Sequence, residues 1–320
     1  MGIPMQAALC AIIGFAVSVL CGPLLIPLLR KLKFGQQILE VGPNWHKSKA
    51  GTPTMGGMIF ILGVAVASLI FVRDLKGLFV ALFSLSCGLI GFLDDYIKVV
   101  KKRNLGLSAM WKIILMLLVC TAFVVLGIEF GIVKTTLWIP FTGIYLDLSY
   151  YISILLVFMM IGFINAVNLT DGIDGLAGSV TFVVSLFFTL ASMVFLAEGM
   201  TSFAAGLCGA LCGFLVYNLH PAKVFMGDTG SLFLGGAVVS LAVLNDMPLM
   251  LILVGIIYLV EAFSVMLQVT YFKLTHGKRI FKMTPIHHHF ELSGYSENRI
   301  VLLFSAITAV GAVIAFLSLV

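Results

Sequence analysis

The sequence predicts an all-α polytopic membrane protein with about ten transmembrane helices in one integral membrane domain, residues 1–320. Of the 320 residues, 61% are hydrophobic and 10% are charged, and the mean hydropathy is +1.16. Soluble domains average about 25% charged residues, so this composition excludes an ordinary soluble class. The apolar residues also gather in runs close to the roughly 17–25 residues that a helix needs to cross a bilayer.

Ten apolar runs give the expected helices in chain order. The first lacks a basic n-region and a clear cleavage site, so we expect a retained helix rather than a cleaved signal peptide. The eighth is short, and the segment 131–149 between the fourth and fifth predicts a small hairpin because β-branched and aromatic residues surround Pro140 and Gly143. The runs are 5–29, 55–72, 77–93, 112–130, 150–167, 176–197, 202–219, 230–245, 248–271 and 300–320.

The basic residues predict the orientation. Of the 19 lysines and arginines, only Arg73, Lys76 and Lys134 fall in loops on one side of the predicted bundle. By the positive-inside rule the other side faces the cytoplasm, and both termini face outside. Most of the net charge of +5 therefore reflects the orientation of the loops in the membrane, and it does not indicate nucleic-acid binding. All six cysteines fall in predicted helices without a Cx2C pair, so we expect neither disulfides nor zinc.

Six short polar clusters lie at or just past the cytoplasmic ends of the apolar runs. An Asp at the bilayer centre costs roughly 2.5–3.5 kcal/mol on insertion scales, so such groups belong at helix ends or in functional cavities. Their convergence predicts a catalytic site at the cytoplasmic membrane face. The clusters are Asp94-Asp95, Asn165 with Asn168, Asp171 with Asp174, Asn218 with His220, Gly227-Asp228, and His287-His288-His289.

Asp94 and Asp95 end the third run. Negative charge at a helix C-terminus opposes the macrodipole, so capping does not explain the pair, although helix-end solvation is the alternative. Neighbouring carboxylates point about 100° apart and need not share one ligand. One of them can hold a cation or act as a base.

The segment 165–178, NAVNLTDGIDGLAG, places Asn165, Asn168, Asp171 and Asp174 at intervals of three residues, about one turn apart. Its glycines permit tight turns and a close approach of a ligand. The segment therefore suits a phosphate–metal complex or a polar head group. A glycine turn with Asx caps is the alternative.

Two further segments carry chemistry. Asp228 is suited to Mg2+, which takes few carboxylates together with phosphate oxygens, and Phe225 beside it is either core packing or a platform for a base. The histidines 287–289 lack the spacing of a zinc hydrolase and are better read as donors to phosphate or sugar.

Glu261 and Gln268 share one face of the ninth run. An ionisable residue there is functional by default, with helix pairing as the alternative.

Together, carboxylates for Mg2+, lysines and histidines for phosphate, and glycine turns at a membrane face indicate phosphoryl transfer. A lipid is the expected second substrate, since a reaction of soluble substrates alone would not need ten helices.

Five motifs in order then resemble the polyprenyl-phosphate N-acetylhexosamine-1-phosphate transferases over nearly the whole chain. They are GTPTMGG (51–57), GFLDDYIK (91–98), NAVNLTDGIDGL (165–176), VFMGDTGSL (224–232) and TPIHHHFE (284–291). The HHHFE form is similar to the bacterial branch that transfers phospho-N-acetylmuramoyl-pentapeptide. The resemblance implies transfer from UDP-MurNAc-pentapeptide to undecaprenyl phosphate, giving lipid I and UMP. It also implies Mg2+, a homodimer in the bacterial inner (cytoplasmic) membrane, and a broken ninth helix that leaves a groove for the prenyl chain.

The resemblance also implies residue roles. Asp228 is expected to bind Mg2+, with Asp171 as a second candidate ligand, and Asp94 is the candidate base. The catalytic set is Asp94, Asp95, Asp171, His287, His288 and Lys112. The substrate-binding set is Lys47, Thr52, Asn165, Asn168, Asp174, Asn218, Phe225, Gln268 and His289.

Two rival functions remain at this point. The first is a sibling transferase that uses UDP-GlcNAc. The second is a transporter or flippase, which should carry its polar residues near mid-span at interrupted helices. Here most of them lie at helix ends on one side.

Overall fold

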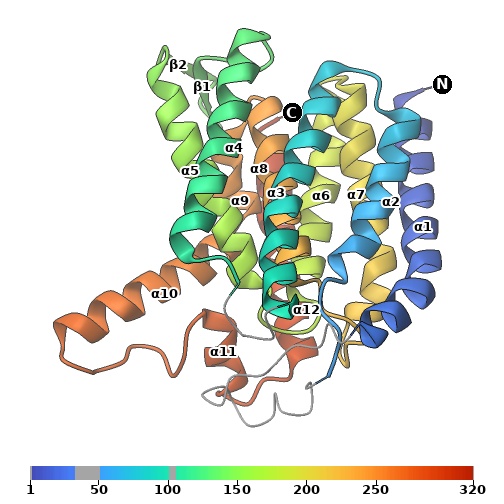
Figure 1. The fold of residues 1–320 in the computed structure, drawn as a ribbon. Coiled ribbons are helices and arrows are strands. Elements are labelled where there is room, and N and C mark those ends of the chain that lie inside the picture. Colours follow the sequence, from blue (N-terminus) through green and yellow to red (C-terminus); the bar gives the residue numbers. More distant parts are fainter. Residues whose placement is uncertain (1, 33–50, 101–105, 320) are drawn as a thin grey trace.

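The computed structural model describes residues 2–32, 51–100 and 106–319. The described residues form ten apolar helices, which run back and forth as one bundle except for α10, which projects from it (Figure 1). Nine of the helices in the described ranges are long and apolar enough to cross a membrane. The ten are α1 (Ile3–Lys31), α2 (Gly57–Phe71), α3 (Leu75–Val100), α4 (Ala109–Glu129), α5 (Tyr151–Thr170), α6 (Leu176–Val194), α7 (Glu198–Asn218), α8 (Gly227–Leu244), α10 (Ile256–Leu274) and α12 (Glu297–Leu317).

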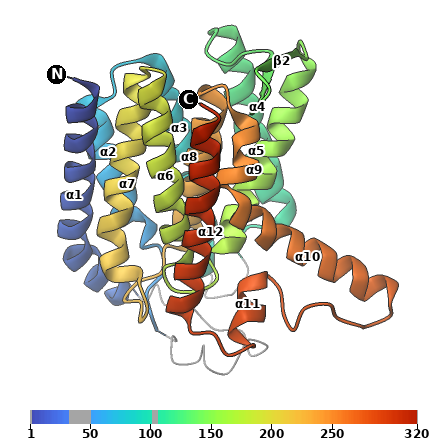
Figure 2. The same ribbon diagram turned by 180° about the vertical axis from the view of Figure 1, so that it is seen from behind.

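The all-α prediction is confirmed, and the expected hairpin is present. Strands β1 (Thr136–Ile139) and β2 (Ile144–Asp147) pair antiparallel, with Thr136 opposite Asp147. The turn between them contains Gly143 at φ 68°, in the left-handed region that favours glycine. The hairpin lies at the end of the bundle where both termini lie, as Figures 1 and 2 show from opposite sides. The orientation relative to the membrane stays a prediction.

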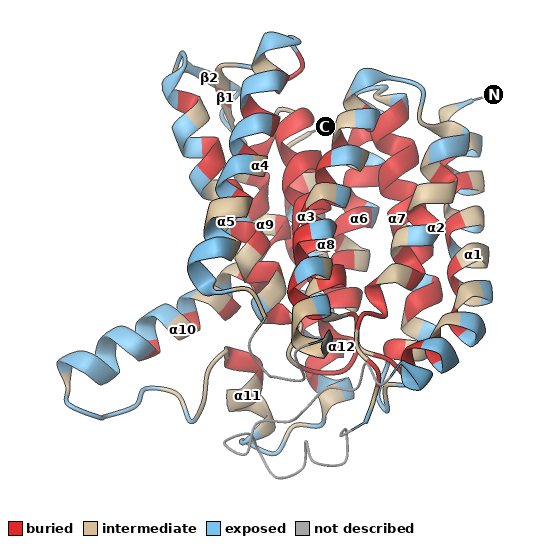
Figure 3. Cartoon of the chain, viewed as in Figure 1, coloured by how far each residue is buried: buried red, intermediate tan, exposed pale blue. Residues whose placement is uncertain are grey.

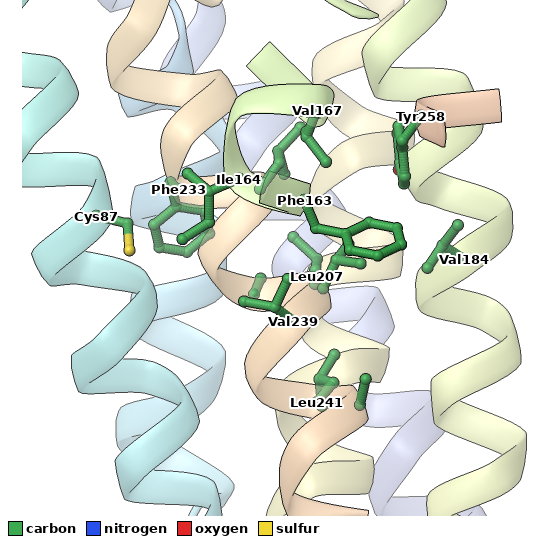
Figure 4. Close-up of a cluster of buried hydrophobic side chains, with 14 of the residues drawn as sticks. Cys87, Phe163, Ile164, Val167, Val184, Leu207, Phe233, Val239, Leu241 and Tyr258 are labelled. Atoms are coloured by element: carbon green, nitrogen blue, oxygen red, sulfur yellow. The ribbon is translucent and has the colours of Figure 1, made fainter. Parts of the chain in front are cut away.

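Helix α8 forms the centre of the bundle and packs against α3 and α5. Every residue from Thr229 to Leu244 is buried. Figure 4 shows Phe233 and Val239 of α8 beside Ile164 of α5 and Cys87 of α3. The outer helices instead expose large apolar side chains on their outward faces (Figure 3). Such a surface suits hydrocarbon, and it explains why the outer helices are as apolar as the core.

The prediction of one continuous helix over residues 248–271 is wrong. The chain forms a 3-10 turn, η2 (Pro248–Met250), and a short helix, α9 (Leu251–Val254), before α10 begins at Ile256. Gly255 separates α9 from α10 with φ −101° and ψ 17°. Beyond this break α10 leaves the bundle at a steep angle (Figures 1 and 2).

Helix α3 is also longer than predicted. It continues to Val100, so Asp94 and Asp95 lie within its final turns rather than after its end. Helix α4 begins at Ala109, three residues before the predicted start, behind the N-cap Ser108, whose Oγ accepts from Trp111 N. Helix α2 has 15 residues, about 22 Å of helix, which is short for a full crossing.

Candidate active site

Three carboxylates meet where α3 ends and α8 begins. Asp94, Asp95 and Asp228 each place an oxygen within 4.8 Å of the others. Gly227 makes this approach possible because it adopts φ 69°, and a Cβ there would lie 2.6 Å from Asp95 Oδ2. A side chain at 227 would therefore be strained and would separate the two helices at their polar ends.

Two lysines neutralise part of this charge. Lys98 Nζ lies 2.6 Å from Asp94 Oδ2, 3.0 Å from Asp228 Oδ2 and 3.6 Å from Asp95 Oδ1. Lys112 Nζ lies 2.8 Å from Asp228 Oδ2 and 3.4 Å from Asp94 Oδ1. Three carboxylates against two ammonium groups leave one negative charge, which attracts a cation, while the lysines attract anions.

Asn168 of α5 orients Asp228. Its Nδ2 donates to Asp228 Oδ1 over 2.9 Å and to Ser231 Oγ over 2.7 Å. Asp95 Oδ2 accepts from the backbone N and the Oγ1 of Thr229, at 2.9 and 2.7 Å, so this carboxylate also holds the first turn of α8 in place.

Asp171 follows α5 directly and lies outside the membrane-spanning segments. Burial, and then the negative charges of Asp228, Asp95 and Asp174, raise the pKa of Asp171 to about 8. A bound cation would favour its ionised form. Asp171 therefore lies in a place where negative charge exceeds positive charge.

A second polar cluster lies beside the first. Asp174 Oδ2 is 3.0 Å from His220 Nδ1 and accepts from Ala222 N over 3.0 Å. Glu297, at the start of α12, accepts from Asp174 N over 2.9 Å and lies 3.4 Å from His220. Asp174, His220 and Glu297 thus form a compact polar group that joins the start of α6, the end of α7 and the start of α12.

The GTPTMGG and VFMGDTG motifs pair through their backbones. Phe225 N donates to Pro53 O, and Gly56 N donates to Phe225 O, both over 2.8 Å. Thr52 and Phe225, both half-buried, therefore lie in adjoining segments. Asn218 Nδ2 donates to Val224 O over 2.9 Å and supports the same loop.

The three histidines of α11 (Ile286–Glu291) diverge, as expected for consecutive residues. His287 Nδ1 lies 3.0 Å from Glu261 Oε2, and His288 Nδ1 lies 2.6 Å from Glu291 Oε2. His289 Nδ1 accepts from Lys282 N over 3.2 Å.

Gln268 fastens the loop that follows α10. Its Nε2 donates to Phe281 O, and its Oε1 accepts from Ile280 N and Phe281 N, at 2.9 to 3.1 Å. Both ends of the amide are therefore engaged with backbone.

The structure does not keep the four residues of the NAVNLTDGIDG segment in one line, because α5 ends at Thr170 and the chain then turns. Asn168 reaches Asp228, whereas Asp174 belongs to the second cluster. Asn165 donates to Ile161 O within its own helix and lies against Met116 Sδ. Lys47 lies outside the described residues.

Sequence reasoning named Lys98 only as one of several lysines suited to phosphate and did not pair it with Asp94 and Asp95. It also missed Glu297 and the partnership of Glu261 with His287. The ion pairs of Lys98 could have been found, because this residue follows Asp94 by four residues and Asp95 by three, which is the helical spacing of an ion pair. Glu297 and Glu261 gain their partners across 123 and 26 residues of chain, and no local pattern signals such contacts.

The arrangement can hold a metal ion and two phosphates. The carboxylate oxygens of Asp94, Asp95 and Asp228 are the hard donors that Mg2+ prefers, and they lie close enough to share one ion. Lys98 and Lys112 lie at the same place, where they can neutralise phosphate oxygens.

Comparison with known proteins agrees with this chemistry. The glycosyl transferase family 4 model matches residues 77–246, from α3 to the end of α8. Over 312 residues the chain is 48% identical to the phospho-N-acetylmuramoyl-pentapeptide-transferase of Thermoanaerobacter sp. (strain X514), covering 97% of this chain and 98% of the relative. The enzyme of the same name from Carboxydothermus hydrogenoformans is 48% identical over 312 residues, covering 95% and 96%. That from Clostridium kluyveri is 48% identical over 311 residues, covering 96% and 98%. The chain is therefore an enzyme of glycosyl transferase family 4 and belongs to its phospho-N-acetylmuramoyl-pentapeptide-transferases.

Proposed function

We propose that the protein transfers phospho-MurNAc-pentapeptide from UDP-MurNAc-pentapeptide to undecaprenyl phosphate, forming lipid I and releasing UMP. The observation that carries this proposal is the cluster of three carboxylates and two lysines at one end of an apolar bundle. Two anionic phosphates, one of them on a lipid, can meet only where charge is neutralised at the membrane face. The name shared by the relatives supports the choice of donor.

Asp228 is the proposed principal ligand of Mg2+, with Asp94 and Asp95 near enough to assist and Asp171 as a second candidate ligand. When bound there, the ion would neutralise charge that develops on the diphosphate of the donor. Asn168 would keep the Asp228 carboxylate in its orientation through the 2.9 Å hydrogen bond.

The proposed step is one in-line displacement. An oxygen of undecaprenyl phosphate forms a bond to the sugar-linked phosphorus, and the bond from that phosphorus to the bridging oxygen breaks. The bridging oxygen leaves with UMP. Lys98 and Lys112 would stabilise the negative charge of the phosphates during this exchange. Deprotonation of the acceptor is a small part of the barrier, since the second pKa of a phosphate monoester is about 6, so Asp94 would mainly orient the acceptor.

The remaining predicted residues are assigned to substrate. Phe225 and Asp174 would contact the nucleoside, with Phe225 stacking on uracil. Thr52, in the segment that adjoins Phe225, would bind the substrate, and Asn218 would lie near the diphosphate or the lipid phosphate. Gln268 would act indirectly, because its amide already binds the loop after α10. The other predicted residues stay assigned to the donor or the lipid phosphate; they are His288, His289, Asn165 and Lys47.

The proposed setting is the bacterial cytoplasmic membrane. The site would face the cytoplasm, with both termini outside, and the enzyme would act as a homodimer. The two clusters lie at helix ends opposite the termini, which favours a surface reaction over a transporter with a midplane site.

A donor exchange tests the proposal. Purified protein with undecaprenyl phosphate and Mg2+ should convert UDP-MurNAc-pentapeptide to lipid-linked product and leave UDP-GlcNAc unchanged. Turnover of UDP-GlcNAc alone would transfer the assignment to the sibling reaction. A two-step route through a phospho-aspartate would instead release UMP without the lipid and leave a trappable covalent phosphate on the protein.

A further inference from the structure

Glu261 is a buried acidic residue in α10 that none of the roles above uses. Its side chain is fully buried on the inner face of the helix, with Tyr258 and Ser264 on the same face. A carboxylate in such a place needs a partner, because removing its charge from water is unfavourable. Among the described residues that partner is His287, whose Nδ1 lies 3.0 Å from Glu261 Oε2.

This contact fixes which nitrogen of His287 carries the proton. A carboxylate only accepts hydrogen bonds, so in this contact Nδ1 is the donor and carries the proton. The other oxygen, Glu261 Oε1, has no hydrogen-bond partner among the described residues.

The other nitrogen of His287 faces the polar loop between α5 and α6. Nε2 is buried and has no hydrogen-bond partner within the described ranges of the chain. A Cβ on Gly172 would collide with this nitrogen, so the ring lies directly against the Gly172 backbone between Asp171 and Asp174. A buried polar nitrogen without a partner is unfavourable, and a polar group of the substrate would satisfy it.

We infer that Glu261 is a positioning residue. It holds the proton on Nδ1 of His287 and so keeps Nε2 facing the polar loop between α5 and α6, where it meets a polar group of the phosphate-bearing substrate. This inference rests on the proposed transferase reaction, but the protonation state of His287 can be measured without it. The arrangement follows the general rule that a carboxylate behind an imidazole fixes its tautomer and orientation.

The test combines kinetics with nuclear magnetic resonance. Glu261→Leu replaces the carboxylate with an apolar side chain of similar volume but leaves the buried His287 without its partner, so a lower melting temperature is expected beside the kinetic effect. The expected result is a fall in kcat of about 10- to 100-fold, with the KM for Mg2+ unchanged. In protein labelled with 15N-histidine, the Nδ1–H signal of His287, assigned with His287→Gln, should disappear in Glu261→Leu.

Ser264→Ala is the matched control, since within the described part of the chain its hydroxyl donates only to the Glu261 backbone carbonyl on the same face of α10. It should retain wild-type kcat and the Nδ1–H signal. The double variant Glu261→Leu/His287→Gln should be no slower than His287→Gln alone, because Glu261 acts through His287.

Unchanged kcat together with an unchanged His287 spectrum in Glu261→Leu would overturn the inference, and so would a loss of stability without a loss of kcat. If Glu261→Leu does not fold, Glu261→Gln decides the matter. Its amide oxygen can keep the Nδ1–H bond but lacks the charge, so a several-fold lower kcat is expected, and wild-type kcat would overturn the inference. A His287 spectrum that responds as predicted in a protein without transferase activity would contradict the proposed function and leave the positioning role intact.

Discussion

Replacing Asp228 with Asn should abolish metal-dependent turnover while leaving the fold intact. Asp228 is the carboxylate that contacts Lys98 (3.0 Å), Lys112 (2.8 Å) and Asn168 (2.9 Å). The amide of Asn keeps the size of the side chain and an oxygen for Asn168, so the packing of α8 should survive. The cluster of three carboxylates and two lysines would, however, lose its excess negative charge.

The size of the effect follows from that charge. Two unit charges 4 Å apart interact by roughly 4 kcal/mol at an effective dielectric constant of 20, and rearrangement of the lysines offsets part of it. A divalent ion that loses this carboxylate therefore loses about 3–5 kcal/mol of attraction. In rate or in metal affinity this corresponds to roughly 10²- to 10⁴-fold.

The assay is the initial rate of UMP release across a Mg2+ titration, together with Mn2+ binding by electron paramagnetic resonance and the melting temperature. Asp246→Asn is the control, because it removes a carboxylate 2.7 Å from Lys134 at the opposite end of the bundle. Asp246→Asn should keep wild-type turnover. An Asp228→Asn rate within tenfold of wild type, with unchanged Mn2+ affinity, would refute the reasoning.

Three further predictions follow from the same geometry. Lys112→Gln should lower kcat by about 100-fold through loss of a charged contact to phosphate, while Lys134→Gln should not, as measured by UMP release. The pKa of Asp171 is about 8 in the folded protein against an ordinary 3.8, so the metal-free protein should lose stability as pH rises from about 4 to about 8. Melting temperatures measured in EDTA should fall over this pH range. Asp171→Asn should make the melting temperature less dependent on pH. Gly227→Ala should destabilise the protein by about 1–3 kcal/mol because of its positive φ and the adjacent carboxylate. Gly162→Ala, whose Cβ would meet nothing within 4 Å, should leave the melting temperature nearly unchanged.

The sequence was sufficient to predict the bundle because each helix carries its own apolar run. Lipid-facing and buried positions are both apolar here, so ten runs predicted ten helices without knowledge of their contacts. The hairpin was predictable from Gly143 and the β-branched residues around it. The break at Gly255 was implied only by the family resemblance, because a glycine within an apolar run does not by itself interrupt a helix.

The candidate site was predictable in its residue types but not in its groupings. Asp94, Asp95 and Asp228 were identified as polar residues at helix ends, and the structure brings them together through the packing of α3 against α8. That pairing joins segments more than 130 residues apart, which no local spacing encodes. For the same reason, the spacing within the motif could not show that Asp174 pairs with His220 and Glu297.

The most direct test of the account is UMP release by the detergent-purified protein from UDP-MurNAc-pentapeptide, with and without undecaprenyl phosphate, and in Mg2+ or EDTA. The account predicts release only when both the lipid and Mg2+ are present. Release without the lipid would contradict direct displacement, and no release by folded protein in lipid-supplemented detergent would contradict the transferase assignment itself.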